Sequence, residues 1–259
     1  MTDTAPTLLG IFAHPDDESL ACGGLFARSA ALGARVVVVS LTRGEAGPAG
    51  SQDADAVTRL GAVRAAEFLA AARVLGAATA VAGEHADGML PWIAPEVLEA
   101  DVAAMLGTYQ PHVVVTFDAD GLYWHPDHIA VHERTTAAVA ALGPRAPALF
   151  YVSMPRGQMR AVTERAGDRA PAVPGLLDPD VFGADAPAPT LVVDAGPYAA
   201  VKLAAIRCHW SQFAASAFAA LSDADAGLIA FEHYRRAPVG ASGPTFLDRL
   251  GTSPVGLGS

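Results

Sequence analysis

Short, uninterrupted apolar runs alternate along the chain with longer stretches in which apolar residues recur at helical spacing. Three of the runs are rich in β-branched or large aliphatic residues and span 8–13, 35–42 and 112–118. A run without polar alternation predicts a strand that is buried on both faces. Such strands are typical of parallel sheets, so the runs predict the centre of an α/β fold.

Amphipathic stretches follow these strands and predict helices over about 18–32, 57–76 and 126–142. Weaker patterns predict further elements at 79–82, 95–106, 190–194 and 198–213. The alternation of strands and helices predicts a Rossmann-like, mostly parallel sheet with helices on both faces. Because ligands bind at the carboxyl ends of the strands in such sheets, we expect the functional site there.

The second half of the chain has a less regular pattern. Residues 154–190 are rich in Pro, Gly, Asp and Ala without a clear period, which predicts an irregular excursion or lid. We expect a single domain over 1–236 and a weakly ordered tail over 237–259. A chain of 259 residues is long enough for one large α/β domain.

Composition narrows the possible partners. The chain has 17 Lys plus Arg against 27 Asp plus Glu and no basic run, so we expect no nucleic-acid partner. It has no signal-peptide pattern and no apolar stretch near the ~18 residues of a membrane span, which predicts a cytoplasmic protein without a membrane partner. Cys22 and Cys208 are isolated, so we expect buried thiols and no disulfide.

Histidines and acidic residues are clustered in the segments that follow two of the predicted strands. "HPDDE", which contains His14, Asp16 and Asp17, follows the strand at 8–13, and "HPDH" follows the strand at 112–118. Imidazole and carboxylate groups form a partial shell for Zn²⁺ or a related cation, and catalytic zinc usually has three protein ligands. A cation would also offset the repulsion between adjacent aspartates. The two clusters therefore predict one shared metal site.

Spacing alone leaves the third ligand open. His128 and His132 are four residues apart on a predicted helix, whereas His125 and His128 lie on either side of its start. A purely structural alternative is that Asp16 or Asp17 caps the following helix and complements its dipole. The presence of His-Pro-Asp at two strand ends favours the metal site over this alternative.

Together with "TRGEAG" (42–47), the two clusters resemble the LmbE/PIG-L family of zinc-dependent N-deacetylases. Enzymes of this family remove acetyl groups from N-acetylglucosaminyl conjugates. The resemblance extends from about Leu8 to "RCHWSQ" (207–212), which is most of the chain. It implies a small amino-sugar conjugate as the partner.

The resemblance also implies roles for the residues of the two clusters. It implies His14, Asp17 and His128 as the zinc ligands. Asp16 would be the general base, and a protonated His125 would stabilise the oxyanion of the tetrahedral intermediate. Zinc lowers the pKa of a bound water toward about 7. Fe²⁺ is also possible in a site of two histidines and one aspartate.

Further positions match the mycothiol-pathway branch of the family, which deacetylates a GlcNAc-inositol substrate. The match implies that Tyr123 is catalytic and that Arg64 and Asp87 bind sugar hydroxyls. The structural alternatives are a loop tyrosine, a solvated arginine and an Asp-Gly turn. His132 has no metal role in this pattern, and Glu18 either orients a ligand histidine or caps a helix.

We therefore expect a metal-dependent hydrolase that removes acetyl from an N-acetylglucosamine-containing small molecule. Two alternatives use the same metal core: an amidase of thiol-adduct pseudodisaccharides and a deacetylase that tailors a natural product. A non-catalytic metal-binding module is an alternative of a different class. A dinucleotide-binding oxidoreductase is disfavoured, because "HPDDE" stands where the glycine-rich fingerprint would be and would repel a pyrophosphate.

Overall fold

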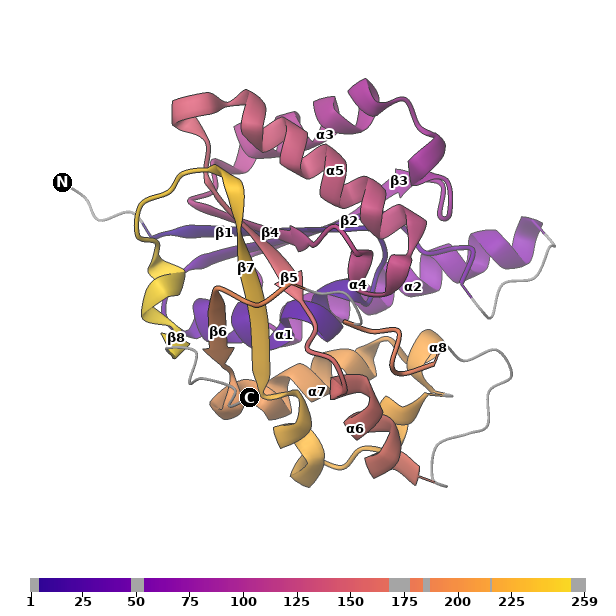
Figure 1. Ribbon diagram of the computed structural model, residues 1–259. Coiled ribbons are helices and arrows are strands. Elements are labelled where there is room, and N and C mark those ends of the chain that lie inside the picture. Colours follow the sequence, from indigo (N-terminus) through magenta and orange to yellow (C-terminus); the bar gives the residue numbers. More distant parts are fainter. Residues whose placement is uncertain (1–4, 48–53, 168–177, 184–186, 215, 253–259) are drawn as a thin grey trace.

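One central sheet organises the chain in the computed structural model (Figure 1), which describes residues 5–47, 54–167, 178–183, 187–214 and 216–252. The described strands are β1 (Thr7–Phe12), β2 (Arg35–Thr42), β3 (Thr79–His85), β4 (Val113–Phe117), β5 (Ala148–Ser153), β6 (Leu191–Asp194), β7 (Phe231–Gly240) and β8 (Gly251–Thr252). Their order across the sheet is β3-β2-β1-β4-β5-β7-β6-β8. The first five strands of this order are parallel, and the last three add antiparallel pairs.

Helices cover both faces of the sheet. The described α-helices are α1 (Asp17–Ala31), α2 (Ala54–Val74), α3 (Pro95–Tyr109), α4 (Gly121–Trp124), α5 (Pro126–Ala141), α6 (Gln158–Ala166), α7 (Ala199–Cys208) and α8 (Trp210–Phe213). Helices α3 and α5 pack together on one face, and α1, α2 and α7 pack on the other (Figure 1). The prediction of a Rossmann-like, mostly parallel sheet is confirmed. None of the helices within the described ranges is long and apolar enough to cross a bilayer.

The parallel strands form the core that the apolar runs predict. Every residue of β1, β4 and β5 is buried, and so is every residue of β2 except Arg35. Burial of one large aliphatic or aromatic side chain of this kind stabilises the fold by about 1.5–3 kcal/mol. These strands therefore hold the loops at their carboxyl ends on a rigid base.

The antiparallel edge of the sheet differs from the sequence prediction. The predicted domain boundary at 236 falls inside β7, and β8 pairs with β6, so residues 237–252 belong to the fold. β7 pairs with both β5 and β6, and these long-range hydrogen bonds override the Pro- and Gly-rich local sequence. The prediction of a weakly ordered tail is wrong up to residue 252, and 253–259 lie outside the described residues.

The predicted excursion at 154–190 is partly helical. Helix α6 occupies 158–166, and 178–183 are also described, whereas 168–177 and 184–186 lie outside the described residues. The helix predicted at 198–213 is two helices, because the chain leaves helical geometry at His209 (φ −81°, ψ 50°) between α7 and α8.

Candidate metal centre

The two polar clusters lie side by side at the carboxyl edge of the sheet. β1 pairs with β4 in parallel, so the loop 13–16 after β1 and the segment 118–125 after β4 leave the sheet at the same edge. Helices α1 and α5 then begin at Asp17 and Pro126. The meeting of both clusters follows from the adjacency of their strands.

Three side chains converge in a group that we call the metal triangle, formed by His14, Asp17 and His128. His14 Nδ1 is 3.2 Å from His128 Nε2, His128 Nε2 is 3.3 Å from Asp17 Oδ1, and His14 Nδ1 is 3.5 Å from Asp17 Oδ2. Ligand atoms bound at about 2.0–2.1 Å to a tetrahedral zinc lie about 3.3 Å apart. All three residues are buried. The triangle therefore fits a divalent cation.

The outer hydrogen bonds of both histidines direct their lone pairs into the triangle. The Nε2–H of His14 donates to Asp127 Oδ2 at 3.1 Å and lies 3.0 Å from Asp87 Oδ1. The Nδ1–H of His128 donates to the carbonyl oxygen of Gly121 at 3.0 Å. In the neutral forms of both rings, His14 Nδ1 and His128 Nε2 then present lone pairs to each other and to the Asp17 carboxylate. A cation would turn this repulsion into attraction.

The pKa shifts of the triangle residues also favour a bound cation. Burial acts to lower the pKa of His14, but hydrogen bonds to Asp127, Asp17 and Asp87 outweigh it and raise this pKa well above its usual value. Burial acts to raise the pKa of Asp17, but the charge of His128 and hydrogen bonds to both histidines hold it well below its usual value. The triangle therefore combines an ionised carboxylate with a strong preference for positive charge.

Asp127 is a member of the site to which the sequence interpretation assigned no role. It is fully buried, and its carboxylate accepts the N–H groups of Gly88 at 2.8 Å and Leu90 at 3.1 Å in addition to the bond from His14. Such a carboxylate fixes the orientation of a ligand histidine and raises its basicity. The repeated His-Pro-Asp was the available signal, since Asp127 is the aspartate of the second copy.

Asp16 lies beside the triangle in a strained backbone conformation (φ 121°, ψ −30°) and makes no side-chain capping bond to α1. The Asp17 carboxylate accepts the backbone N–H of His14 at 2.8 Å. The helix-cap alternative is therefore wrong for Asp16, and Asp17 is turned back toward the preceding loop. Burial raises the pKa of Asp16 to about 6, against the opposing charge of Arg64. Strained non-glycine residues of this kind cluster at functional sites.

Glu18 supports this strained residue. It is fully buried, its Oε2 accepts the backbone N–H of Asp16 at 3.0 Å, and its Oε1 accepts from His209 Nε2 at 2.7 Å. The hydrogen-bond partners of Glu18 are Asp16, Ser19 and His209. Its bond to the backbone of Asp16 lies at the start of α1 and corresponds to the predicted capping role, and none of these partners is a ligand of the triangle. The buried Glu18–His209 pair thus links the loop 13–16 to the break between α7 and α8.

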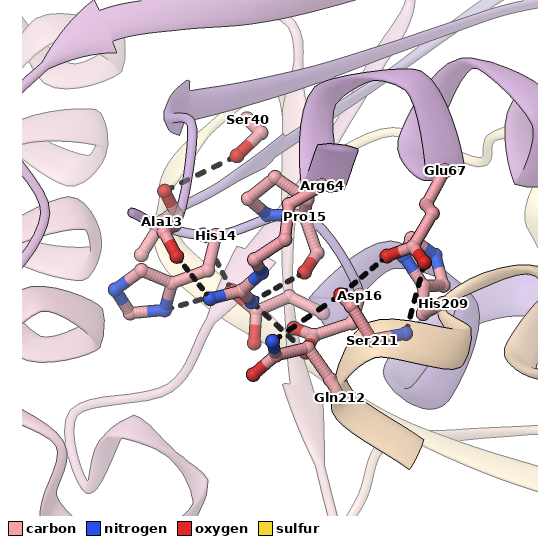
Figure 2. A network of polar contacts seen from close by, with 12 residues as sticks. Ala13, His14, Pro15, Asp16, Ser40, Arg64, Glu67, His209, Ser211 and Gln212 are labelled. Carbon is pink, nitrogen blue, oxygen red and sulfur yellow. Dashed lines mark hydrogen bonds and ion pairs between the residues drawn. The ribbon is translucent and has the colours of Figure 1, made fainter. Parts of the chain in front are cut away.

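Arg64 is buried in a polar network (Figure 2), so the solvated-arginine alternative is wrong. Its guanidinium donates to the carbonyl oxygens of Gly44 at 2.6 Å and Pro15 at 2.8 Å, and to Asp16 Oδ2 at 3.1 Å. Gly44 has φ +67°, and a Cβ there would lie 2.4 Å from the Arg64 Cζ atom. A glycine in "TRGEAG" is therefore required for the arginine to approach the loop. Arg64 orients Asp16 directly.

The Asp87 carboxylate is also bound on both oxygens. Oδ1 faces His14 Nε2, and Oδ2 accepts the N–H of Ala46 at 2.9 Å. Glu45 Oε1 in turn accepts the N–H of Asp87 at 2.9 Å, so the loops at 42–47 and 85–88 hold each other. Asp87 thus forms an Asp-Gly turn and also contacts His14 of the triangle.

His125 differs from its predicted protonated form. Its Nδ1 accepts the backbone N–H of Asp127 at 3.2 Å, which assigns the proton of the neutral ring to Nε2. Burial and the neighbouring charges of His128 and His14 lower the pKa of His125 to about 4. The neutral imidazole can still donate from Nε2. The ring centroid of His125 lies 4.8 Å from that of His14, so this donor is beside the triangle.

Tyr123 lies in a second strained segment, between Leu122 (φ 66°) and Trp124 (φ 64°). Its ring centroid is 5.7 Å from that of His125 and 5.2 Å from that of His128. Burial raises the pKa of its phenol, so the hydroxyl stays protonated and can donate. His132 lies outside the triangle, where its Nδ1 donates to the carbonyl oxygen of Phe117 at 2.9 Å.

A cavity of about 530 Å³ opens onto the triangle. At the triangle it is lined by His14, Asp16, Asp17, Arg64, Asp87 and His125. The cavity is therefore lined by six of the eight predicted catalytic, metal and substrate residues together with Tyr123, and the eighth, His128, lies beside His14. The fold and this site define a class: Rossmann-like α/β proteins that can hold a divalent cation between two histidines and an aspartate at the carboxyl edge of the sheet.

Comparison with known proteins identifies the family within this class. The chain belongs to the PIG-L family, whose family description is GlcNAc-PI de-N-acetylase and whose pattern matches residues 9–139. A relative from Actinosynnema mirum, named 1D-myo-inositol 2-acetamido-2-deoxy-alpha-D-glucopyranoside deacetylase, is 36% identical over 94% of this chain and 95% of its own length. The resemblance to this family and to its GlcNAc-inositol branch is confirmed.

Solved structures share the fold. An N,N'-diacetylchitobiose deacetylase from Pyrococcus horikoshii matches with a TM-score of 0.64 and 22% identity, covering 91% of this chain and 85% of that one. A 4-carboxy-2-hydroxymuconate hydratase from Pseudomonas putida matches with a TM-score of 0.60 and 17% identity, covering 93% and 99%. Because this fold carries different reactions, the function must be argued from the site.

Proposed function

We propose that the protein is a metal-dependent N-deacetylase that removes acetyl from an N-acetylglucosamine-containing small molecule. The observation that carries the proposal is the metal triangle, in which ligand atoms of His14, Asp17 and His128 lie 3.2–3.5 Å apart. The carboxyl group of Asp16 lines the same cavity. The family supports it, because its description is a de-N-acetylase. The Actinosynnema mirum relative is named for a GlcNAc-inositol substrate. We assign the acetamide group of such a compound as the reacting group in the substrate of this chain.

We assign His14, Asp17 and His128 as the ligands of Zn²⁺, with Fe²⁺ as the alternative ion that the same donor set accepts. When bound, such an ion lowers the pKa of a water and polarises an amide carbonyl. Asp127 and Asp87 orient His14 through its Nε2–H, and the Gly121 carbonyl orients His128. These contacts hold both histidines in the orientation in which they would bind the ion.

Asp16 is the general base in this proposal. It accepts a proton from the attacking water and returns it to the departing amine, which needs a carboxylate that is held close to the triangle but is free of the metal. Arg64 holds the Asp16 carboxylate by one oxygen, and Glu18 holds its backbone N–H. The other carboxylate oxygen remains available for proton transfer.

His125 and Tyr123 stabilise the negative charge that develops on the carbonyl oxygen. The neutral His125 donates from Nε2, because its Nδ1 is already an acceptor, and Tyr123 donates its phenolic proton. Fixed donors in a water-poor pocket are typically worth about 10²–10³ in rate each. Arg64 has N–H groups, and Asp87 has oxygen lone pairs, that their contacts within the protein do not use. We therefore assign both residues as candidates for binding the sugar.

Acetate release from N-acetylglucosaminides, measured before and after metal removal, tests this function. We expect protein stripped by a chelator to be inactive and to regain activity with Zn²⁺ or Fe²⁺. The GlcNAc-inositol conjugate and the methyl N-acetyl-glucosaminide are suitable first substrates, because both contain the reacting amide. Full activity in a preparation without metal would contradict the proposal.

A further inference from the structure

We propose that the natural substrate carries an apolar substituent on its amino sugar, and that this substituent binds the part of the cavity remote from the metal triangle. We call that part the distal wall; it is formed by Met159, Thr163, Phe182, Phe213, Ser216 and Phe218. The inference rests on the proposed deacetylase function, because it concerns the same cavity. It adds the chemical class of the group that accompanies the reacting amide.

Charge is divided unequally within the cavity. The charged and titratable lining residues that the structure describes, including the phenol of Tyr123, surround the triangle. The described residues of the distal wall carry none. A ligand group placed there would exchange water for aromatic rings and a thioether, which favours an apolar group.

The two hydroxyls of the distal wall are already satisfied within their own segments. Thr163 Oγ1 donates to the carbonyl oxygen of Met159 at 2.9 Å, and Ser216 Oγ donates to that of Phe213 at 2.9 Å. Each hydroxyl has only one proton, so neither has a donor left for a ligand. A polyol such as inositol would find no donors there and only the remaining lone pairs of two hydroxyls, which are fewer partners than it has in water. Buried unpaired hydroxyls weaken binding.

The shape of the wall also suits an apolar group. The rings of Phe213 and Phe218 meet edge to face with centroids 5.5 Å apart, and Phe182 packs 4.9 Å from Tyr123 beside the triangle. The wall therefore begins next to the reacting centre and continues away from it. At about 530 Å³ the cavity is within the size range of pockets that hold drug-sized ligands, roughly 300–1,000 Å³, and is far larger than an acetyl group needs.

The apolar substituent can come from two sources, an aglycone at the anomeric carbon or a longer acyl chain on the nitrogen. Four substrates separate them: the methyl N-acetyl-glucosaminide as reference, the GlcNAc-inositol conjugate, a benzyl N-acetyl-glucosaminide and a methyl N-hexanoyl-glucosaminide. Free-amine release by the metal-loaded protein gives kcat/KM for each. We expect the benzyl or the hexanoyl substrate to exceed the reference about tenfold or more, and the faster of the two identifies the source.

The outcomes separate this inference from the function on which it rests. A kcat/KM for the inositol conjugate that equals or exceeds both apolar substrates would overturn the apolar class while supporting the deacetylase. An absence of amine release from all four substrates would overturn the deacetylase function, and the inference with it.

A substitution in the wall tests the location. Met159→Gln keeps the length of the side chain on α6 but adds polar atoms, and we expect it to lower the ratio of kcat/KM between the preferred apolar substrate and the reference about tenfold, mainly through KM. Trp92→Ala is the matched control, because Trp92 is exposed and does not line the cavity, and it should leave the ratio unchanged. An unchanged ratio in Met159→Gln would exclude the wall as the binding site.

Discussion

The metal triangle and the distal wall line one cavity but are held in different ways. Each ligand of the triangle lies in a loop or helix start that follows a parallel strand. Each is fixed by a hydrogen bond, to the same segment for Asp17 and His128 and to Asp127 for His14. The distal wall comes from α6, 178–183, the end of α8 and the segment that follows it. Its two hydroxyls donate to carbonyl oxygens three or four residues earlier in the chain. The difference teaches that the rigid sheet positions the chemistry, whereas peripheral segments can vary to change the substrate.

Removing a ligand of the triangle should have the largest effect. We expect His14→Ala to lose the bound metal and, with it, deacetylation to background, because two ligand atoms cannot hold the ion at its usual affinity. Metal analysis of the purified protein, together with acetate release, measures this. His132→Ala, a histidine on α5 outside the triangle, is the control and should retain metal; equal metal loss in both variants would contradict the ligand assignment.

Substitution of the proposed base should separate metal binding from turnover. Asp16→Asn should keep the metal and lower kcat by about 10²–10⁴, because the amide cannot accept the proton. The side chain keeps its size and can still accept from Arg64. Loss of metal in this variant would show that the roles of Asp16 and Asp17 are exchanged.

Asp127 tests how strongly the triangle depends on its support. Asp127→Asn should weaken metal affinity about 10–100-fold, because an uncharged partner lowers the basicity of His14. Competition with a chelator of known affinity measures the change. Thr163→Val in the distal wall is the comparison, and its metal affinity should equal that of the unaltered protein. An unaltered affinity in Asp127→Asn would mean that Asp87 alone orients His14.

The smallest effect is expected behind the triangle, at the Glu18–His209 pair. Burial acts to lower the pKa of His209, but Glu18, with Asp16 and Glu67 nearby, raises it above the usual value. The free energy of unfolding therefore gains a contribution that is complete below the unfolded pKa of about 6.5 and is lost as the pH rises through the higher folded pKa.

Glu18→Gln should remove most of this pH dependence and lower the free energy of unfolding at pH 6 by about 1–1.5 kcal/mol. Urea unfolding of both proteins at pH 6 and pH 9 gives the comparison, and the difference between them should narrow at the higher pH. A constant difference across this range would mean that His209 is not charged in the folded protein.

The motifs were predictable because their geometry is local. The first His-Pro-Asp follows β1 within two residues and the second follows β4 after a short segment, so the pattern of apolar runs was enough to place both at one edge of the sheet. The burial of Arg64 was not predictable, because it depends on the approach of α2 to the Gly44 loop. The strands β5 and β7 were also missed, since their stability comes from pairing between distant segments.

The sequence by itself determined the α/β class, the family and the residues that meet at the carboxyl edge, because these follow from apolar periodicity and from two short motifs. Only the tertiary structure decided what each of them contacts: that Asp16 caps no helix, that Asp127 bonds to His14, and that His125 Nδ1 accepts the backbone N–H of Asp127. It alone also assembled the distal wall from α6, 178–183, the end of α8 and the segment that follows it. Hydrogen-bond partners and cavity walls arise between segments far apart in the chain, and no local pattern encodes them.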